Sequence, residues 1–267
     1  MNKSSISSVL RRLKLLYFAD LARFYLEKLR NKKANAVFRK NNPDVQLPPD
    51  YLMYESFQLN YEKYYTGSID TAKWLVEHLS KYKKPGHLKI LDWGCGPGRV
   101  IRHLPEILGD GCEYYGTDYN PKSIQWCSDN LKNISFNLNS LEADLPYPND
   151  FFDFVYGLSI FTHLSEDMHY WWIKELLRTL KHDGILFLTT QGDNFKIKLT
   201  QAELEKYERG ELVVRGKVKE GHRTYSAFHP EEFMRRLFCN VEVLEHITSN
   251  PLKGSYLPQD VWMVRKK

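Results

Sequence analysis

Short apolar runs alternate with amphipathic segments along most of the chain. Each run is only four to seven residues long, which fits a buried strand, and between the early ones apolar residues recur at the three- and four-residue steps of a helix. The order strand, helix, strand predicts an α/β fold with a mostly parallel sheet. The predicted strands are 88–91, 113–117, 134–138, 153–156, 185–190, 241–247 and 261–264.

Polar residues predict where several helices begin. Ser68 is expected to cap a helix whose apolar face runs from Ile69 to Leu79. Ser165 is expected to cap another, whose first turn holds Glu166 and Asp167, as the helix dipole favours. Pro105 is expected to interrupt the helix that follows the first strand.

The N-terminal segment carries an apolar stripe with helical spacing over residues 6–30: Ile6, Leu10, Leu13, Tyr17, Leu21 and Phe24. Residues 1–40 hold 11 Lys and Arg against 2 Asp and Glu, whereas the rest of the chain holds 27 against 31. Two interpretations stay open. The helix packs its stripe on the fold, which we favour, or it is a basic amphipathic helix lying on an anionic membrane surface.

Prolines and composition predict the domain organisation. The proline-containing stretch 41–50 interrupts the helical pattern, so we expect residues 1–60 to form a basic helical extension with a linker and residues 61–267 to form the main domain. The polar segment 193–228 is predicted to be an insertion, with a helix and a hairpin, that caps the substrate site. An aromatic stripe at Tyr51, Tyr54, Phe57, Tyr61, Tyr64 and Tyr65 indicates core packing.

A glycine-rich turn directly follows the first predicted strand, and the rest of the domain is organised around it. Gly94, Gly96 and Gly98 alternate after Asp92, and glycine lets a ligand approach the backbone closely. A dinucleotide fingerprint requires a small residue where Arg99 stands. A carboxylate at Asp92 is also poorly placed for a pyrophosphate but well placed to attract a cationic ligand.

With Asp92 before Gly-x-Gly-x-Gly, the sequence resembles the class I S-adenosylmethionine-dependent methyltransferases. The resemblance implies a Rossmann-like, doubly wound seven-stranded sheet, mostly parallel with an antiparallel last strand. It also implies S-adenosylmethionine as cofactor and S-adenosylhomocysteine as product. Asp118, at the end of the second strand, is expected to bind both ribose hydroxyls, and the segment Ala143-Asp144-Leu145 is expected to border the adenine. The predicted cofactor-binding residues are Asp92, Gly94, Cys95, Gly96, Gly98, Asp118, Tyr119, Ala143, Asp144, Leu145 and Ser159.

A second resemblance covers the segment from Phe161 to Gly184. Phe-Thr-His-Leu at 161–164, followed by a helix and a glycine turn, resembles a bacterial branch of this family that commonly accompanies polysaccharide biosynthesis. Asp183 stands where that branch usually has a glycine, a departure that we expect the turn to tolerate.

His163 is the first candidate for a catalytic base, because it follows the fourth strand, whose carboxyl end borders the ligand in open α/β sheets. The alternative is a structural histidine that fixes the loop. Weaker candidates are Tyr65, which lies in a segment that often closes over the cofactor in related enzymes, and His222, Tyr225 and His229.

Several function classes are disfavoured by what the sequence lacks. It has neither the Asp/Asn-Pro-Pro-Tyr pattern of amide methylation nor the Pro-Cys pair of cytosine methylation, so a small-molecule, sugar or lipid-linked acceptor is preferred to a nucleic acid. Cys95, Cys112, Cys127 and Cys239 form no metal-binding pairs, which predicts no metal site and a reduced, cytoplasmic setting. This setting includes a peripheral place at the inner face of the membrane if residues 1–40 bind there. A nicotinamide-dependent oxidoreductase and a non-catalytic cofactor-binding scaffold stay as alternatives.

Overall fold

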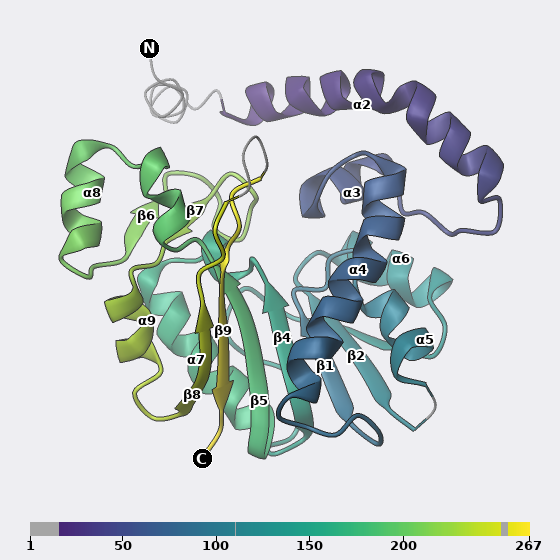
Figure 1. Ribbon diagram of the computed structural model, residues 1–267. Coiled ribbons are helices and arrows are strands. Elements are labelled where there is room, and N and C mark those ends of the chain that lie inside the picture. Colours follow the sequence, from purple (N-terminus) through teal and green to yellow (C-terminus); the bar gives the residue numbers. More distant parts are fainter. Residues whose placement is uncertain (1–15, 110, 252–255) are drawn as a thin grey trace. The chain divides into compact units, whose positions relative to one another are not determined.

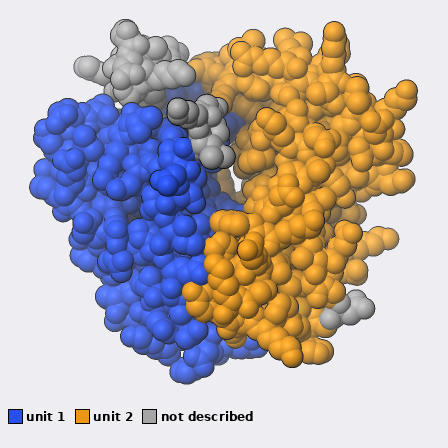
Figure 2. Space-filling view, in the orientation of Figure 1, with its two compact units in different colours: residues 1–16, 140–267 blue, residues 17–139 orange. Residues whose placement is uncertain are grey.

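The computed structural model describes residues 16–109, 111–251 and 256–267. The chain divides into two compact units (Figure 2). Unit 2 comprises residues 17–139, and unit 1 comprises, among the described residues, Leu16 and the segment from Ser140 to the C-terminus. The predicted boundary at residue 60 falls inside unit 2, and the predicted division into domains stays a prediction.

Unit 2 contains three parallel strands, β1 (Lys89–Trp93), β2 (Glu113–Asp118) and β3 (Ser135–Leu138). The buried residues of β1 and β2 follow one another without strict alternation, as is typical of strands covered on both faces. After β1 come a short 3-10 helix (Ile101–His103) and α5 (Leu104–Leu108), and α6 (Pro121–Asn130) connects β2 to β3.

Unit 1 contains the strands β4 (Phe152–Leu158), β5 (Leu180–Thr190), β8 (Glu242–Ile247) and β9 (Asp260–Arg265). β4 and β5 are parallel, and β9 runs antiparallel to both β5 and β8. The helices α7 (Glu166–Thr179) and α9 (Glu231–Leu237) belong to this unit, and a 3-10 helix (Phe161–His163) follows β4 (Figure 1).

The strands belong to a seven-stranded sheet in the order β3-β2-β1-β4-β5-β9-β8. The order reverses direction after β1, as in doubly wound α/β folds. The predicted Rossmann-like sheet, mostly parallel with an antiparallel last strand, is confirmed. All seven predicted strands occur within a few residues of their predicted positions.

The segment 193–228 folds as the sequence predicts, into a helical part and a hairpin. It contains a 3-10 helix (Asp193–Lys198), α8 (Gln201–Glu208) and the antiparallel strands β6 (Val213–Arg215) and β7 (Ser226–Phe228). α8 begins at a capping box, in which Thr200 accepts from the Glu203 amide and the Glu203 side chain accepts from Thr200.

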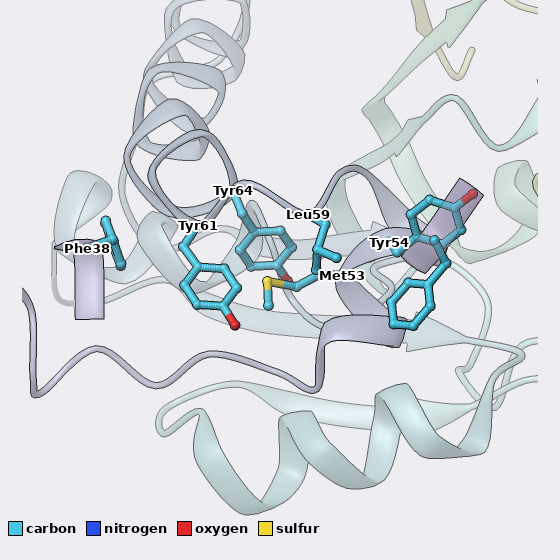
Figure 3. Close-up of a cluster of buried hydrophobic side chains, with 7 residues drawn as sticks. Phe38, Met53, Tyr54, Leu59, Tyr61 and Tyr64 are labelled. Atoms are coloured by element: carbon cyan, nitrogen blue, oxygen red, sulfur yellow. The ribbon is translucent and has the colours of Figure 1, made fainter. Parts of the chain in front are cut away.

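Three helices precede the sheet within unit 2: α2 (Leu16–Asn41), α3 (Asp50–Ser56) and α4 (Tyr61–Ser80). They enclose a buried cluster formed by Phe24, Phe38, Met53, Tyr54, Leu59, Tyr61 and Tyr64 (Figure 3). Tyr51 and Tyr65 pack against its margin. The aromatic stripe is therefore core packing, as predicted, except at Phe57, which is 41% exposed.

The predicted N-terminal stripe is described only in its last part, because Ile6, Leu10 and Leu13 lie outside the described residues. Of the remaining members, Phe24 is buried and Leu21 packs on the same cluster, whereas Tyr17 is exposed. Where it is described, this stripe mainly packs on the fold, which was the favoured interpretation. No helix among the described residues is long and apolar enough to cross a membrane.

Two predicted helix signals are wrong, at Ser68 and Pro105, and the one at Ser165 is confirmed in its position. α4 begins at Tyr61 with Asn60 as its cap, so Ser68 lies inside the helix, where it is buried and donates to the Tyr64 carbonyl. Ser165 does precede α7, but its side chain makes no capping bond. Pro105 does not interrupt a helix; it stands in the first turn of α5, where its missing amide costs nothing.

The turn before the main part of β5 tolerates Asp183, as expected. Asp183 adopts a left-handed backbone with φ of 59°, a conformation that Asp accepts more readily than most residues. Its amide donates to the Lys266 carbonyl at 3.0 Å, which fixes the turn to the end of β9.

Candidate functional site

The glycine turn after β1 has a left-handed backbone at every second position. Gly94, Gly96 and Gly98 have φ angles of 75°, 51° and 68°, values that are strained for residues with a Cβ. The amides of Gly94 and Cys95 both donate to the Thr117 carbonyl at 2.8 Å. β2 therefore holds the start of the turn directly beside its own carboxyl end.

Two of these glycines are also closely packed. A Cβ on Gly98 would lie 2.5 Å from Cδ1 of Leu131, and one on Gly96 would lie 3.1 Å from Cβ of Ser56. These contacts give the glycines a structural reason in addition to the predicted close approach of a ligand, which stays a prediction. The alternating glycines are required by the φ angles and by close packing against α3 and the end of α6.

Asp118 ties the end of β2 to the glycine turn. Its Oδ2 accepts from the Gly96 amide at 2.9 Å and its Oδ1 accepts from the Asn120 amide at 2.7 Å. Burial of the carboxyl raises the pKa of Asp118 to about 6, although both amide bonds act to lower it. A carboxylate offers about four lone-pair sites, so each oxygen can still accept a hydroxyl donor.

Side chains from α3 and α4 support the turn from the other side, and sequence reasoning missed them. The Tyr64 hydroxyl donates to the Pro97 carbonyl at 3.2 Å. Arg99 donates to the Ser68 hydroxyl at 3.0 Å and lies 4.2 Å over the Phe57 ring. Arg99, which breaks the dinucleotide fingerprint, is therefore used to join the turn to α4 and to the end of α3. The helical spacing of Tyr64 and Ser68 was visible in the sequence, but their contact with the turn was not.

The remaining predicted cofactor residues of unit 2 flank this turn. Asp92 lies at the end of β1 with 4% of its surface exposed. Cys95 is buried, which raises the pKa of its thiol, and burial raises the pKa of Tyr119 to about 12. These residues place a carboxylate at each of two adjacent strand ends, with the glycine turn between them, an arrangement that can accept hydroxyl donors and attract a cation.

In unit 1, the segment Ala143-Asp144-Leu145 is held by an ion pair on α7. The Leu145 amide donates to Oε1 of Glu175 at 2.7 Å, and Arg178 donates to the Leu145 carbonyl at 3.2 Å. Glu175 and Arg178 are themselves 2.7 Å apart. The two charged groups neutralise each other and bind both the amide and the carbonyl of Leu145. The backbone conformation of this segment is therefore fixed by α7.

Ser159, directly after β4, is also fixed by side chains. It has a left-handed backbone with φ of 68°. Its amide donates to the Thr189 hydroxyl at 2.8 Å, and its own hydroxyl accepts from Gln259 at 2.8 Å. The Thr189 hydroxyl in turn donates to Gln259 at 2.7 Å. Thr189 and Gln259 were not predicted, since no local pattern marks a residue that is needed 100 positions away.

His163 is fixed by the segment before β7. Its Nδ1 lies 2.9 Å from the Tyr225 carbonyl oxygen, and its own carbonyl accepts from the Gly221 amide at 2.9 Å. A carbonyl only accepts, so Nδ1 carries the proton, and in the neutral ring Nε2 carries the lone pair. Burial lowers the pKa of His163, and the nearby Arg223 and His222 lower it further. The ring is therefore neutral at pH 7, with Nε2 able to accept a proton.

The weaker candidates have other partners. His229 is buried, and its Nε2 lies 2.9 Å from Nε2 of His169, whose Nδ1 contacts the Ser165 carbonyl at 2.6 Å. Burial lowers the pKa of His169 to about 4 and lowers the pKa of His229 well below its usual value, so both rings are neutral and belong to the core. His222 contacts the Thr224 hydroxyl, and the Tyr65 ring packs against that of His103.

Within the described residues, no group of three His, Cys, Asp or Glu side chains has the arrangement of a metal site. All four cysteines are unbridged. The chemistry that the described side chains offer is thus hydrogen bonding at the strand ends of unit 2 and, in unit 1, the neutral imidazole of His163, whose Nε2 can accept a proton.

Comparison with known proteins agrees with this geometry. Residues 90–184 match the family model described as a methyltransferase domain. A curated relative from Arabidopsis thaliana, a tRNA (carboxymethyluridine(34)-5-O)-methyltransferase, is 26% identical over 151 residues, which are 56% of this chain and 34% of the relative. The chain thus spans about a third of the length of that relative.

Solved structures share the fold. A S-adenosylmethionine-dependent methyltransferase from Methanosarcina mazei matches with a TM-score of 0.55 and 21% identity, covering 71% of this chain and 96% of that one. The PH0226 protein from Pyrococcus horikoshii matches with a TM-score of 0.55 and 16% identity, covering 77% and 96%. At these identities the likeness shows the fold alone.

Proposed function

We propose that the chain, whose residues 90–184 match a methyltransferase domain, is a class I S-adenosylmethionine-dependent methyltransferase that methylates an oxygen or nitrogen atom of a small-molecule, sugar or lipid-linked acceptor. The observation that carries the acceptor half of this proposal is the imidazole of His163. The Tyr225 carbonyl holds its Nδ1, so Nε2 is left as a base.

The residues of unit 2 are proposed to hold the cofactor. Asp118 accepts the ribose hydroxyls with the lone pairs that its bonds to Gly96 and Asn120 leave available. Asp92 attracts the cationic amino acid end, and the glycine turn, with Cys95, lies along the ligand. In unit 1, Ala143, Asp144 and Leu145 are proposed to border the adenine. Tyr119 and Ser159 are assigned to the same cofactor site.

His163 is proposed to remove a proton from the acceptor as the methyl group is transferred. The sulfonium supplies an electrophilic methyl group, so the protein has to align the acceptor and accept its proton. The neutral ring of His163 can accept the proton of the acceptor. Its Nδ1–H donates to the Tyr225 carbonyl, which fixes the orientation of the ring and of the Nε2 lone pair. The insertion 193–228 supplies that carbonyl, which supports its proposed role as a cap over the substrate.

The class of acceptor rests on the sequence, which lacks the patterns of amide and cytosine methylation. It also rests on charge, because residues 41–267 hold more acidic than basic residues, unlike a nucleic-acid groove. One observation favours a second candidate: the Arabidopsis relative acts on tRNA. A tRNA acceptor is therefore included in the test.

A labelling experiment tests the proposal. The full chain is incubated with S-adenosylmethionine carrying a labelled methyl group and with cell extract, which is then divided into small-molecule, lipid, polysaccharide and RNA fractions. We expect label in one of the first three fractions, and about 10²- to 10⁴-fold slower labelling with His163→Asn. Label in RNA alone would replace the proposed acceptor with the tRNA candidate. The absence of S-adenosylmethionine binding, or binding of NAD instead, would overturn the proposal and favour the oxidoreductase alternative. Cofactor binding with no transfer to any fraction would favour the non-catalytic scaffold.

A further inference from the structure

α2 has two apolar faces, and only one of them packs on the fold. On the inward face, Phe24 and Phe38 belong to the buried cluster, and Asn35 donates to the Leu59 carbonyl at 2.9 Å and accepts from the Tyr61 amide. These contacts fix the rotation of the helix about its own axis. Whatever lies on the opposite side of α2 is therefore held toward the solvent.

The opposite side carries large apolar residues. They are 53–69% exposed and, at 3.6 residues per turn, fall within an arc of about 120°. We call them the exposed stripe: Phe18, Tyr25, Leu26, Leu29 and Val37. The small residues Ala22 and Ala36 lie on the same arc and are also exposed. This set is distinct from the stripe that the sequence predicts, whose described members mainly face the cluster.

Positive charge surrounds the exposed stripe. Arg23 and Arg30 border it on one side and Lys28 and Lys32 on the other, at helical spacing, and Lys33 lies within it. Lys28 pairs with Asp50 of α3 at 2.9 Å and Arg30 pairs with Glu27, so the positive charge rests mainly on Arg23, Lys32 and Lys33. α2 holds seven basic residues and only two acidic ones. Both acidic groups are already engaged and lie away from the stripe.

Those two acidic groups are Asp20 and Glu27. The Asp20 carboxylate accepts from the Tyr54 hydroxyl at 2.8 Å, and Glu27 pairs with Arg30 at 3.0 Å. No carboxylate of α2 itself therefore lies within the arc of the exposed stripe to repel an anionic partner.

We propose that the exposed stripe of α2 is a docking surface for an anionic lipid bilayer. Aromatic and leucine side chains flanked by lysine and arginine are the chemistry of a helix lying in a membrane interface. Phosphate groups attract the flanking cations while the apolar side chains enter the boundary of the acyl chains. A nucleic-acid backbone offers no apolar surface on which the exposed stripe could be buried. A second copy of the same surface would bring like charges together. The bilayer is the occupant that uses both features.

Docking would place the enzyme beside lipid-linked acceptors, and this consequence rests on the proposed function. The docking itself does not, because it needs neither cofactor nor catalysis. If a variant of the exposed stripe loses vesicle binding but still binds S-adenosylmethionine, the docking is supported and the proposed function is unaffected. If the unchanged protein binds S-adenosylmethionine but no vesicles, the docking is overturned and the proposed function still stands.

The test is sedimentation of the full chain with vesicles of phosphatidylcholine, with and without phosphatidylglycerol. We expect binding to the anionic vesicles at low salt and about tenfold weaker binding at high salt, as charge screening requires. The variant Leu26→Ser with Leu29→Ser should bind at least about tenfold more weakly, since two apolar anchors are lost. Ala34→Ser, an exposed position of α2 outside the stripe, is the matched control and should bind like the unchanged protein.

Each other outcome overturns the proposal. Equal binding by the Leu26 and Leu29 variant would show that the exposed stripe is not the surface used. Binding that ignores phosphatidylglycerol and salt would remove the anionic requirement. Displacement of the protein from vesicles by tRNA, together with tight tRNA binding that the variant loses, would assign the surface to nucleic acid. A dimer in solution that the variant dissociates would assign it to a second copy. Thermal unfolding of the variants checks that all of them are folded.

Discussion

The glycine turn of unit 2 and the loop after β4 of unit 1 differ in how they are held. The turn is fixed mainly by backbone: three left-handed glycines, two amides on the Thr117 carbonyl, and a third amide on Asp118. The loop is fixed by distant segments of the chain, since the side chains of Gln259 and Thr189 hold Ser159 and the backbone carbonyl of Tyr225 holds His163.

This difference corresponds to two tasks, which are the binding of a shared cofactor and the binding of a particular acceptor. A backbone cradle tolerates almost no change of residue type, and it suits a ligand that every member of a family shares. A loop held by an insertion can change with that insertion, which suits an acceptor that differs between members. We therefore expect substitutions in the turn to affect cofactor binding and substitutions around the loop to affect turnover.

The largest effect is expected for Gly96→Val. A β-branched residue at φ of 51° is strained, and its Cβ would lie 3.1 Å from that of Ser56. S-adenosylmethionine binding should fall below detection by calorimetry. Gly67→Val is the matched control, because that position has nothing within 4 Å of a new Cβ. A folded Gly96→Val protein with normal affinity would remove the turn from the cofactor site.

The same contrast explains what the sequence could predict. Gly94, Gly96, Gly98 and Asp118 form a local pattern with fixed spacing, and the structure joins them through the bond between Gly96 and Asp118. The strands were predictable too, because their apolar runs are continuous. Interactions across long stretches of chain leave no such pattern.

Two errors follow from that limit. Ser68 looks like a helix cap, but it lies inside α4, where it accepts a hydrogen bond from Arg99, 31 residues further on. His229 looks like a candidate base next to a helix start, yet it pairs with His169 in the core. In both cases a distant partner decides the role of the residue, and propensity alone cannot identify that partner.

His163→Asn should lower turnover by about 10²- to 10⁴-fold, the usual contribution of a general base. Asparagine can still donate to the Tyr225 carbonyl, so the loop should stay in place. Because burial lowers the pKa of His163 below 6.5, activity should be complete at pH 7 and fall as the pH drops through that lowered pKa. The fall should be absent from the residual activity of the variant. His222→Asn is the control, and a greater loss there would assign the base to His222.

Acid should weaken cofactor binding through Asp118. Burial raises the pKa of this carboxyl to about 6, so it is mostly ionised at pH 7 and mostly protonated at pH 5. If the ionised form accepts the ribose hydroxyls, affinity should fall about tenfold between these pH values. Asp118→Asn should show no such change. An equally steep dependence in that variant would mean that another group titrates.

The smallest effect is expected at Gln259, which accepts from Thr189 and donates to Ser159. Gln259→Ala should lower the free energy of unfolding by about 1 kcal/mol, the contribution of a typical hydrogen bond, and reduce turnover several-fold with little change in cofactor affinity. Gln201→Ala, in the exposed first turn of α8, is the control. Loss of cofactor affinity equal to the loss of turnover would contradict the division between the two regions.

The division between the turn and the loop is tested most directly by calorimetry of S-adenosylmethionine binding to Asp118→Ala and to His163→Asn, side by side. Asp118→Ala should lose about 1.5–3 kcal/mol of binding free energy, the range for hydrogen bonds to a charged group. His163→Asn should bind the cofactor like the unchanged protein while its turnover falls. If His163→Asn loses as much affinity as Asp118→Ala, or if Asp118→Ala loses none, the cofactor is not held as we describe.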